Sequence, residues 1–247
     1  MTTTDDILAL TANAAPSEEA AGDLALFADA AARGMNSTVV RALRGLRPAS
    51  GAPALPDSPA WRAWLSATAA IAGDEAQGLR GEEWSRAVRP ADRTVRYVVC
   101  AAATAVGDER PAAPSGAPAV GVEAADAAGV TAAVGVGVRA AALVESRLVS
   151  LTDPGGWSLP AVSAVIGAGL AAGLMLGLTP AQLRCTLGIC ATQAAGLHAA
   201  DATDAGPLQA GKAAFNAVEA TKLAELGFTS SGEPLDGRRA LFALFSA

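Results

Sequence analysis

The strongest constraint in this sequence is a long run without a single charge. Residues 161–178 are mostly alanine, glycine and leucine and contain no Asp, Glu, Lys or Arg. The run is long enough to cross a membrane, but Ala and Gly contribute little transfer free energy, and no Lys/Arg cluster or aromatic belt flanks it. We therefore predict a buried helix. Its glycines at 169, 173 and 177 recur every fourth residue, which lets a neighbouring helix approach closely.

Helical periodicity continues through most of the chain. Alternating runs of β-branched and aromatic residues, which are typical of strands, are almost absent. The sequence therefore predicts an all-α fold. The longer helices are expected at residues 5–14, 58–73, 94–106, 126–149, 160–178, 179–196 and 208–226. Prolines at 48–59 and 107–118 indicate loops, and the charged stretch 74–93 is expected to be irregular.

Two helix ends carry recognisable signals. Thr179 precedes Pro180 and stands three residues before Gln182, which is the pattern of a capping box with proline in the first turn. Gly227 is expected to end the helix at residues 208–226 by adopting the left-handed backbone conformation.

Composition excludes several classes of protein. With 24 acidic against 18 basic residues and a net charge of −6, the chain lacks the positive footprint that nucleic acid requires. A single histidine excludes a multi-histidine zinc site, and we expect no metal and no cofactor. Three cysteines without a CxxC pair argue against a disulfide framework and are expected to pack as small apolar groups. No signal peptide or membrane span is predicted, so we expect a cytoplasmic protein.

Several short segments of the last third follow one another in a specific order. They include Leu-Gly-Leu-Thr-Pro-Ala-Gln-Leu at 176–183, Gln-Ala-Ala-Gly-Leu at 193–197 and Ala-Gly-Lys-Ala-Ala at 210–214. Together they resemble the MmgE/PrpD family, which includes 2-methylcitrate dehydratase and cis-aconitate decarboxylase. The resemblance is strong over 156–246 and weak over 20–155. It implies that residues 1–247 form one all-helical domain like the N-terminal domain of that family.

The resemblance also implies a second domain that this sequence does not contain. Longer family members continue into a smaller α+β lid, and the sequence stops where that lid would begin. We therefore expect a lid-less protein, or one half of a split lyase whose lid is encoded separately. The resemblance further implies pairing of the helical domains, so a homodimer is expected.

The positions that match the family's catalytic groups are largely substituted. The family's acidic motif aligns with residues 72–77 and keeps only Asp74 and Glu75, and a following family histidine aligns near Arg93. Ser158 stands in place of the histidine in the Gly-aromatic-His-Pro-Thr motif. In the motif aligned with 203–211, the family's lysine is Gly206 and its histidine is Gln209.

These substitutions bear directly on the chemistry. Dehydrating a hydroxy-tricarboxylate needs a base for the proton next to a carboxylate, an acid for the leaving hydroxide and cations for the other carboxylates. Serine, glycine and glutamine supply none of these. We therefore expect a pseudoenzyme that binds a small ligand or a partner protein. The alternative is an enzyme of specialised metabolism, of lyase, isomerase or cyclase type, that reuses the family cavity.

Two groups of residues are candidates for the site. Asp74 and His198 are the candidate catalytic groups, because a carboxylate pair and the one histidine are able to move protons near neutral pH. The candidate ligand-binding residues are Glu75, Arg93, Trp157, Ser158, Asp204, Gln209 and Lys212.

Several of the candidates also have a structural interpretation, and Arg93 would be one of several surface arginines. Asp74 and Glu75 would belong to a solvated helix end, and His198 would lie at a helix C-terminus, where the dipole favours its charged form. Asp204 would cap the following helix, and Lys212 would pair with an acid such as Glu219.

Overall fold

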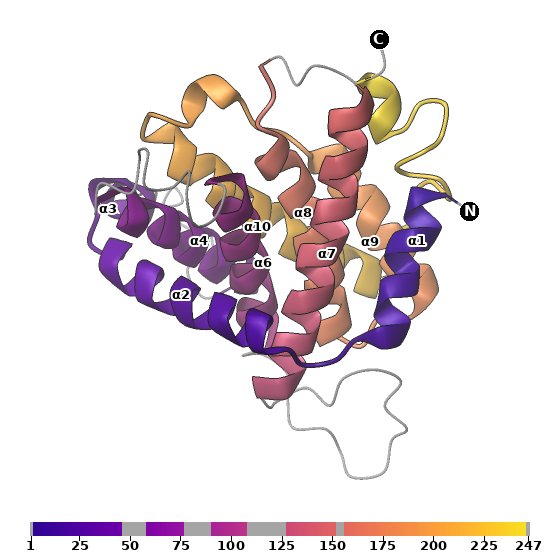
Figure 1. Cartoon of the computed structure of the whole chain (residues 1–247), viewed down its shortest axis with the longest axis horizontal. Helices are drawn as coiled ribbons and strands as arrows, with labels where there is room; N and C mark the ends of the chain where they lie inside the picture. The colour runs from indigo at the N-terminus through magenta and orange to yellow at the C-terminus, as the bar shows by residue number, and fades with distance from the viewer. Residues whose placement is uncertain (1, 46–57, 77–89, 108–126, 152–155, 246–247) are drawn as a thin grey trace, which may run out of the picture.

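The computed structural model describes residues 2–45, 58–76, 90–107, 127–151 and 156–245, and these are almost entirely helical (Figure 1). The α-helices are α1 (Thr3–Ala9), α2 (Glu18–Gly34), α3 (Thr38–Gly45), α4 (Pro59–Ala76), α6 (Pro90–Gly107), α7 (Ala127–Leu151), α8 (Leu159–Met175), α9 (Pro180–Gln193) and α10 (Ala205–Glu225). Short 3-10 turns occupy Leu10–Asn13, His198–Ala200 and Leu241–Leu244. No strand forms among the described residues, apart from one isolated bridge between Trp157 and Leu197. The all-α prediction is confirmed.

Helix α8 lies at the centre of the arrangement. Every residue of it except Pro160 is buried, and it packs against α6, α7, α9 and α10 (Figure 1). The uncharged run is therefore a core helix, as predicted.

One described helix, α7, is long and apolar enough to cross a membrane by length and composition alone. However, 56% of its most apolar window is buried against the rest of the protein. The core helix of a soluble protein passes the same test, so this is weak evidence for a membrane span.

Glycines bring the central helices into backbone contact. A Cβ placed on Gly167 in α8 would lie 2.3 Å from the carbonyl oxygen of Gly137 in α7, and a Cβ on Gly137 would lie 2.7 Å from that of Gly167. Gly34 in α2 and Gly73 in α4 form a second crossing of this kind. Any side chain at these positions would force the helices apart.

The three glycines predicted to share one face, at 169, 173 and 177, have two different structural roles. A Cβ on Gly169 would meet the sulfur of Cys190 at 2.5 Å, and one on Gly173 would meet Leu183 at 2.5 Å, so both positions allow α9 to approach. Gly177 instead ends the helix region in the left-handed conformation, with φ of 67°. The close neighbour predicted from the sequence is therefore α9.

Two of the helix-end predictions hold. Thr179 and Gln182 form the capping box of α9, and Gly227 follows α10 with φ of 91°.

Several predicted boundaries were wrong. Helix α4 continues to Ala76 and α6 begins at Pro90, so both ends of the expected irregular stretch 74–93 are helical. Its middle lies outside the described residues, as do the predicted loops apart from their edges. The segment 5–14 is one α-helix followed by a 3-10 turn, α9 ends at Gln193, and α10 begins at Ala205.

The backbone contact of α7 with α8 predicts a large response to one methyl group. Gly167→Ala should lower the free energy of unfolding by about 2 kcal/mol or more, because the methyl overlaps the Gly137 carbonyl. Gly22→Ala in α2 is the control, since a Cβ there meets nothing within 4 Å. That variant should gain about 0.5–1 kcal/mol from better helix propensity. Urea denaturation compares the two, and equal stabilities would contradict the packing argument.

An ion pair between Asp5 and Arg184 links helix α1 to α9, and we expect acid to break it. Arg184 donates to the Asp5 carboxylate at 2.7 Å; this hydrogen bond and those from Thr2 lower the pKa of Asp5 from 3.8 to about 2. A depressed carboxyl pKa stabilises the fold above the unfolded pKa, and the contribution is lost as pH falls toward 2. The urea midpoint should therefore fall more between pH 4.5 and pH 2 in the wild type than in Arg184→Ala.

Candidate functional site

Asp74 lies in the last turn of α4 and is buried, with 1% of its surface exposed. One carboxylate oxygen accepts a hydrogen bond from Arg33 at 3.0 Å. The other accepts from Arg93 at 2.9 Å and from the hydroxyl of Tyr97 at 2.8 Å. Asp74 therefore joins α4 to α2 and α6, and Glu75 lies half-buried beside it.

The burial of Asp74 contradicts its interpretation as part of a solvated helix end, and its contacts instead give it a structural role inside the fold. A buried carboxyl group that accepts from three donors is costly to disturb. Burial, together with the hydrogen bond to Asp74, raises the pKa of Tyr97 well above its usual value. The sequence analysis missed Arg33 and Tyr97. The signal for Tyr97 was available, since the only tyrosine in the chain, set in an apolar helix, needs a partner for its hydroxyl.

His198 belongs to a different group of side chains. Its Nδ1 lies 2.7 Å from one oxygen of Asp201, and the other oxygen of Asp201 accepts from Gln209 Nε2 at 2.7 Å. Gln209 in turn accepts from the backbone N–H of Leu197 at 3.0 Å. None of the hydrogen bonds of Asp74 among the described residues reaches this group, so the two candidate catalytic residues are held in separate networks.

The backbone around His198 is fixed by the segment that precedes α8. His198 N–H donates to Gly156 O at 2.8 Å, and Ser158 N–H donates to Gly196 O at 3.1 Å. Gly196 has φ of 154° and lies against Ala161, where a Cβ would approach to 2.7 Å. His198 opens a 3-10 turn four residues after α9 has ended; the expectation that it lies at a helix C-terminus was therefore wrong.

Trp157 and Ser158 lie beside the His198 group in different environments. Trp157 is 43% exposed and packs its ring on Phe245 with centroids 5.4 Å apart. Ser158 is buried and precedes α8 without a side-chain capping bond. Trp157 is therefore available at the surface, whereas the Ser158 hydroxyl is not.

Gly206, which the sequence analysis aligned with the family's lysine, has no room for a side chain. A Cβ on Gly206 would lie 2.8 Å from the carbonyl oxygen of Asp201 and 3.1 Å from that of Ala200. The first turn of α10 therefore packs directly on the turn that carries Asp201. This close approach places Asp201 within reach of both His198 and Gln209.

Asp204 and Lys212 do not join the His198 group. Asp204 occupies the N-cap position of α10 but makes no side-chain capping bond; the predicted cap is replaced by Thr203, whose hydroxyl accepts from Ala205 N–H at 3.2 Å. The ammonium of Lys212 lies 3.8 Å from the centroid of Phe215 and 5.0 Å from that of Trp64. Burial lowers the pKa of Lys212, and the charge of Glu219 opposes that shift.

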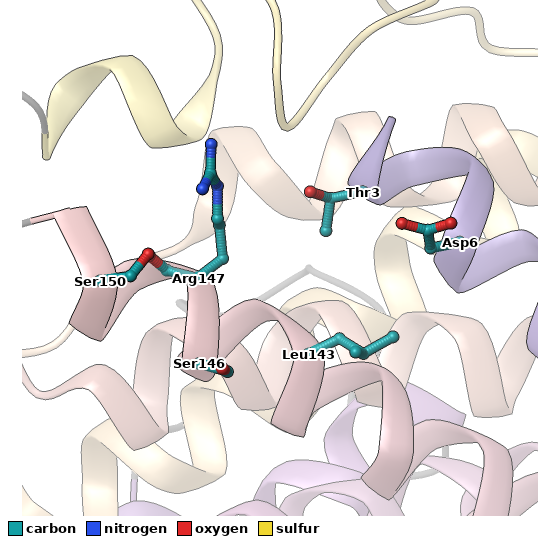
Figure 2. Close-up of a pocket in the computed structure, with 6 residues that line it drawn as sticks. All are labelled: Thr3, Asp6, Leu143, Ser146, Arg147 and Ser150. Atoms are coloured by element: carbon teal, nitrogen blue, oxygen red, sulfur yellow. The ribbon is translucent and has the colours of Figure 1, made fainter. Parts of the chain in front are cut away.

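A groove elsewhere on the surface contains none of the predicted site residues. It has a volume of about 310 Å³ and lies between α1 and α7 (Figure 2). Its lining is Thr3, Asp6, Leu143, Ser146, Arg147 and Ser150. The polar groups predicted to share a cavity therefore do not converge on this one.

The described residues contain no group of three His, Cys, Asp or Glu side chains able to hold a metal ion. The cysteines are free, and Cys100 and Cys190 are buried. Burial raises the pKa of Cys190 to about 12, which keeps its thiol protonated and unreactive at neutral pH.

Comparison with known proteins identifies one family. The family model of the MmgE/PrpD N-terminal domain matches residues 98–247, from α6 to the C-terminal segment. The match includes the segment in which the resemblance was strong and extends further toward the N-terminus. No curated protein matches the chain.

The hydrogen bonds of Asp74 predict that the hydroxyl of Tyr97 stabilises the junction of α2, α4 and α6. Tyr97→Phe should lower the free energy of unfolding by about 1.5–3 kcal/mol, because it removes a hydrogen bond to a buried charge. Thr104→Val on the same helix is the control, since Thr104 bonds only to carbonyls of its own helix. Guanidinium denaturation measures both, and a Tyr97→Phe variant as stable as the wild type would show that the arginines alone satisfy Asp74.

Proposed function

Because the chain belongs to the MmgE/PrpD family, we propose that it is a binding domain of that family that does not catalyse the family's dehydration or decarboxylation. The observation that carries this proposal is the packing of Gly206. A lysine at this position would displace the turn at Asp201, so the cation that the family's chemistry requires is absent and has no space.

The remaining cations near the candidate positions have other partners. Arg93 is paired with Asp74, and Lys212 lies over two aromatic rings. A tricarboxylate needs several cations to offset its charge on binding. The arrangement therefore supports a ligand with little negative charge, or a partner protein, in place of a tricarboxylate.

We also propose that the partner includes a second copy of the chain. Leu226 and Phe228, just after α10, are 79% and 58% exposed. Neighbouring apolar side chains with this exposure are typical of association surfaces. This supports the homodimer expected from the family resemblance.

The loss of the lysine and histidine predicts no turnover of the family's substrates. The purified protein should neither dehydrate 2-methylcitrate nor decarboxylate cis-aconitate, because each missing acid or base costs about 10²–10⁴ in rate. The absorbance of the conjugated double bond and the release of CO₂ report the two reactions. Turnover by the wild type that disappears in Asp74→Asn would overturn the proposal.

Self-association predicts a mass twice that of the 24.4 kDa chain. Light scattering at micromolar concentration should give the dimer, and Phe228→Lys should shift it toward the monomer because a charge would be buried in the interface. Leu26→Lys is the control, since Leu26 is similarly exposed, at 52%, but lies on α2. A wild type that is monomeric under these conditions would exclude the dimer.

A further inference from the structure

The hydrogen bonds around His198 determine which ring nitrogen carries its proton. The N–H of Leu197 can only donate, so it fixes the amide oxygen of Gln209 toward itself. The amide nitrogen of Gln209 then faces Asp201 and donates to it at 2.7 Å. The second oxygen of the Asp201 carboxylate is left to accept from His198 Nδ1 at 2.7 Å.

The neutral imidazole is therefore held with its proton on Nδ1. A carboxylate accepts but does not donate, so the lone pair is left on Nε2. The His198 side chain is 75% exposed, and no hydrogen bond to Nε2 is formed within the described part of the chain. The structure thus presents one oriented base to solvent.

The backbone holds this arrangement in place without a ligand. His198 is anchored through its N–H to Gly156, and the turn carrying Asp201 is packed against Gly206. Gln209 lies on α10, a long helix whose inner face is buried. A base held by rigid elements loses little entropy when it engages a substrate.

The surroundings indicate the charge of a substrate. Asp201 places a carboxylate next to the imidazole, which disfavours an anion. Leu197 and Trp157 expose apolar surface beside it, at 61% and 43%. An uncharged compound with an apolar group fits these neighbours best.

We propose that His198 is a general base that hydrolyses uncharged esters, with Asp201 and Gln209 as its positioning residues. His198 Nε2 takes a proton from a water molecule as the water oxygen bonds to the acyl carbon. The bond from the acyl carbon to the leaving oxygen then breaks, and the imidazolium returns the proton to that oxygen. Asp201 stabilises the imidazolium while it exists. Ester and water become acid and alcohol, and no other reactant is needed.

The single histidine of the chain makes the test specific. The probe is p-nitrophenyl acetate, an uncharged ester, assayed with untagged protein. His198→Gln should lower the rate about a hundredfold, to that of buffer, and Asp201→Asn should lower it by about tenfold or more because the orienting carboxylate is lost. Glu219→Gln is the control, since it removes an exposed carboxylate from α10, the helix of Gln209, and Glu219 takes no part in the His198 group; its rate should stay within about twofold of the wild type.

A second measurement separates positioning from simple charge. Nitrogen-15 NMR of the one imidazole should show the proton on Nδ1 in the wild type and in Glu219→Gln. In Asp201→Asn and Gln209→Ala the proton should redistribute toward Nε2. A wild-type rate equal to that of free 4-methylimidazole at the same concentration, or a tautomer unchanged by Asp201→Asn, would overturn the proposal. The proposed lack of lyase activity would stand in either case.

Discussion

The structure depends on how closely its helices approach one another. Glycines on α7 and α8 bring two backbones into contact, and α8 is buried on nearly every side. With aromatic residues at only 4% of the chain, the core cannot be filled by large rings. Instead, the helices lie close together and leave little space to fill. Close packing of small groups gains dispersion energy over a large contact area, but it tolerates no added volume. The approach of α8 to α7 and to α9 is therefore set by where glycine occurs.

This packing leaves charge only at the margins of the bundle. Asp74 lies at the end of α4, where Arg33 and Arg93 reach it from α2 and α6 while remaining partly exposed. Asp23 is paired in the same way, because Arg96 donates a hydrogen bond to its carboxylate at 2.6 Å. Each buried carboxylate thus has a cation on a neighbouring helix, which removes most of the cost of burying it. Asp74, a candidate catalytic acid in the sequence analysis, joins three helices in the structure.

The candidate site was predictable in part. His198 and Gln209 were both identified from the sequence, one as the only histidine and one as a substituted family position. Their connection through Asp201 was not, because it requires the turn at residues 198–201 to fold back on the first turn of α10. That contact depends on the absence of a side chain at Gly206. The sequence analysis interpreted this glycine only as a missing lysine. Glycine at this position therefore allows the turn and the first turn of α10 to meet.

The sequence by itself determined the helices, the buried run at residues 161–178, the capping box at Thr179 and the helix end at Gly227. These features depend on neighbours a few residues apart, whose spacing follows directly from helix geometry. Only the tertiary structure decided the partners of Asp74, the environment of Lys212 and the tautomer of His198. Each of these depends on contacts between different elements of the fold: Asp74 and Arg33, for example, are 41 positions apart. Local periodicity specifies which face of a helix is buried, but the angle and distance at which two helices cross select the pairs that meet.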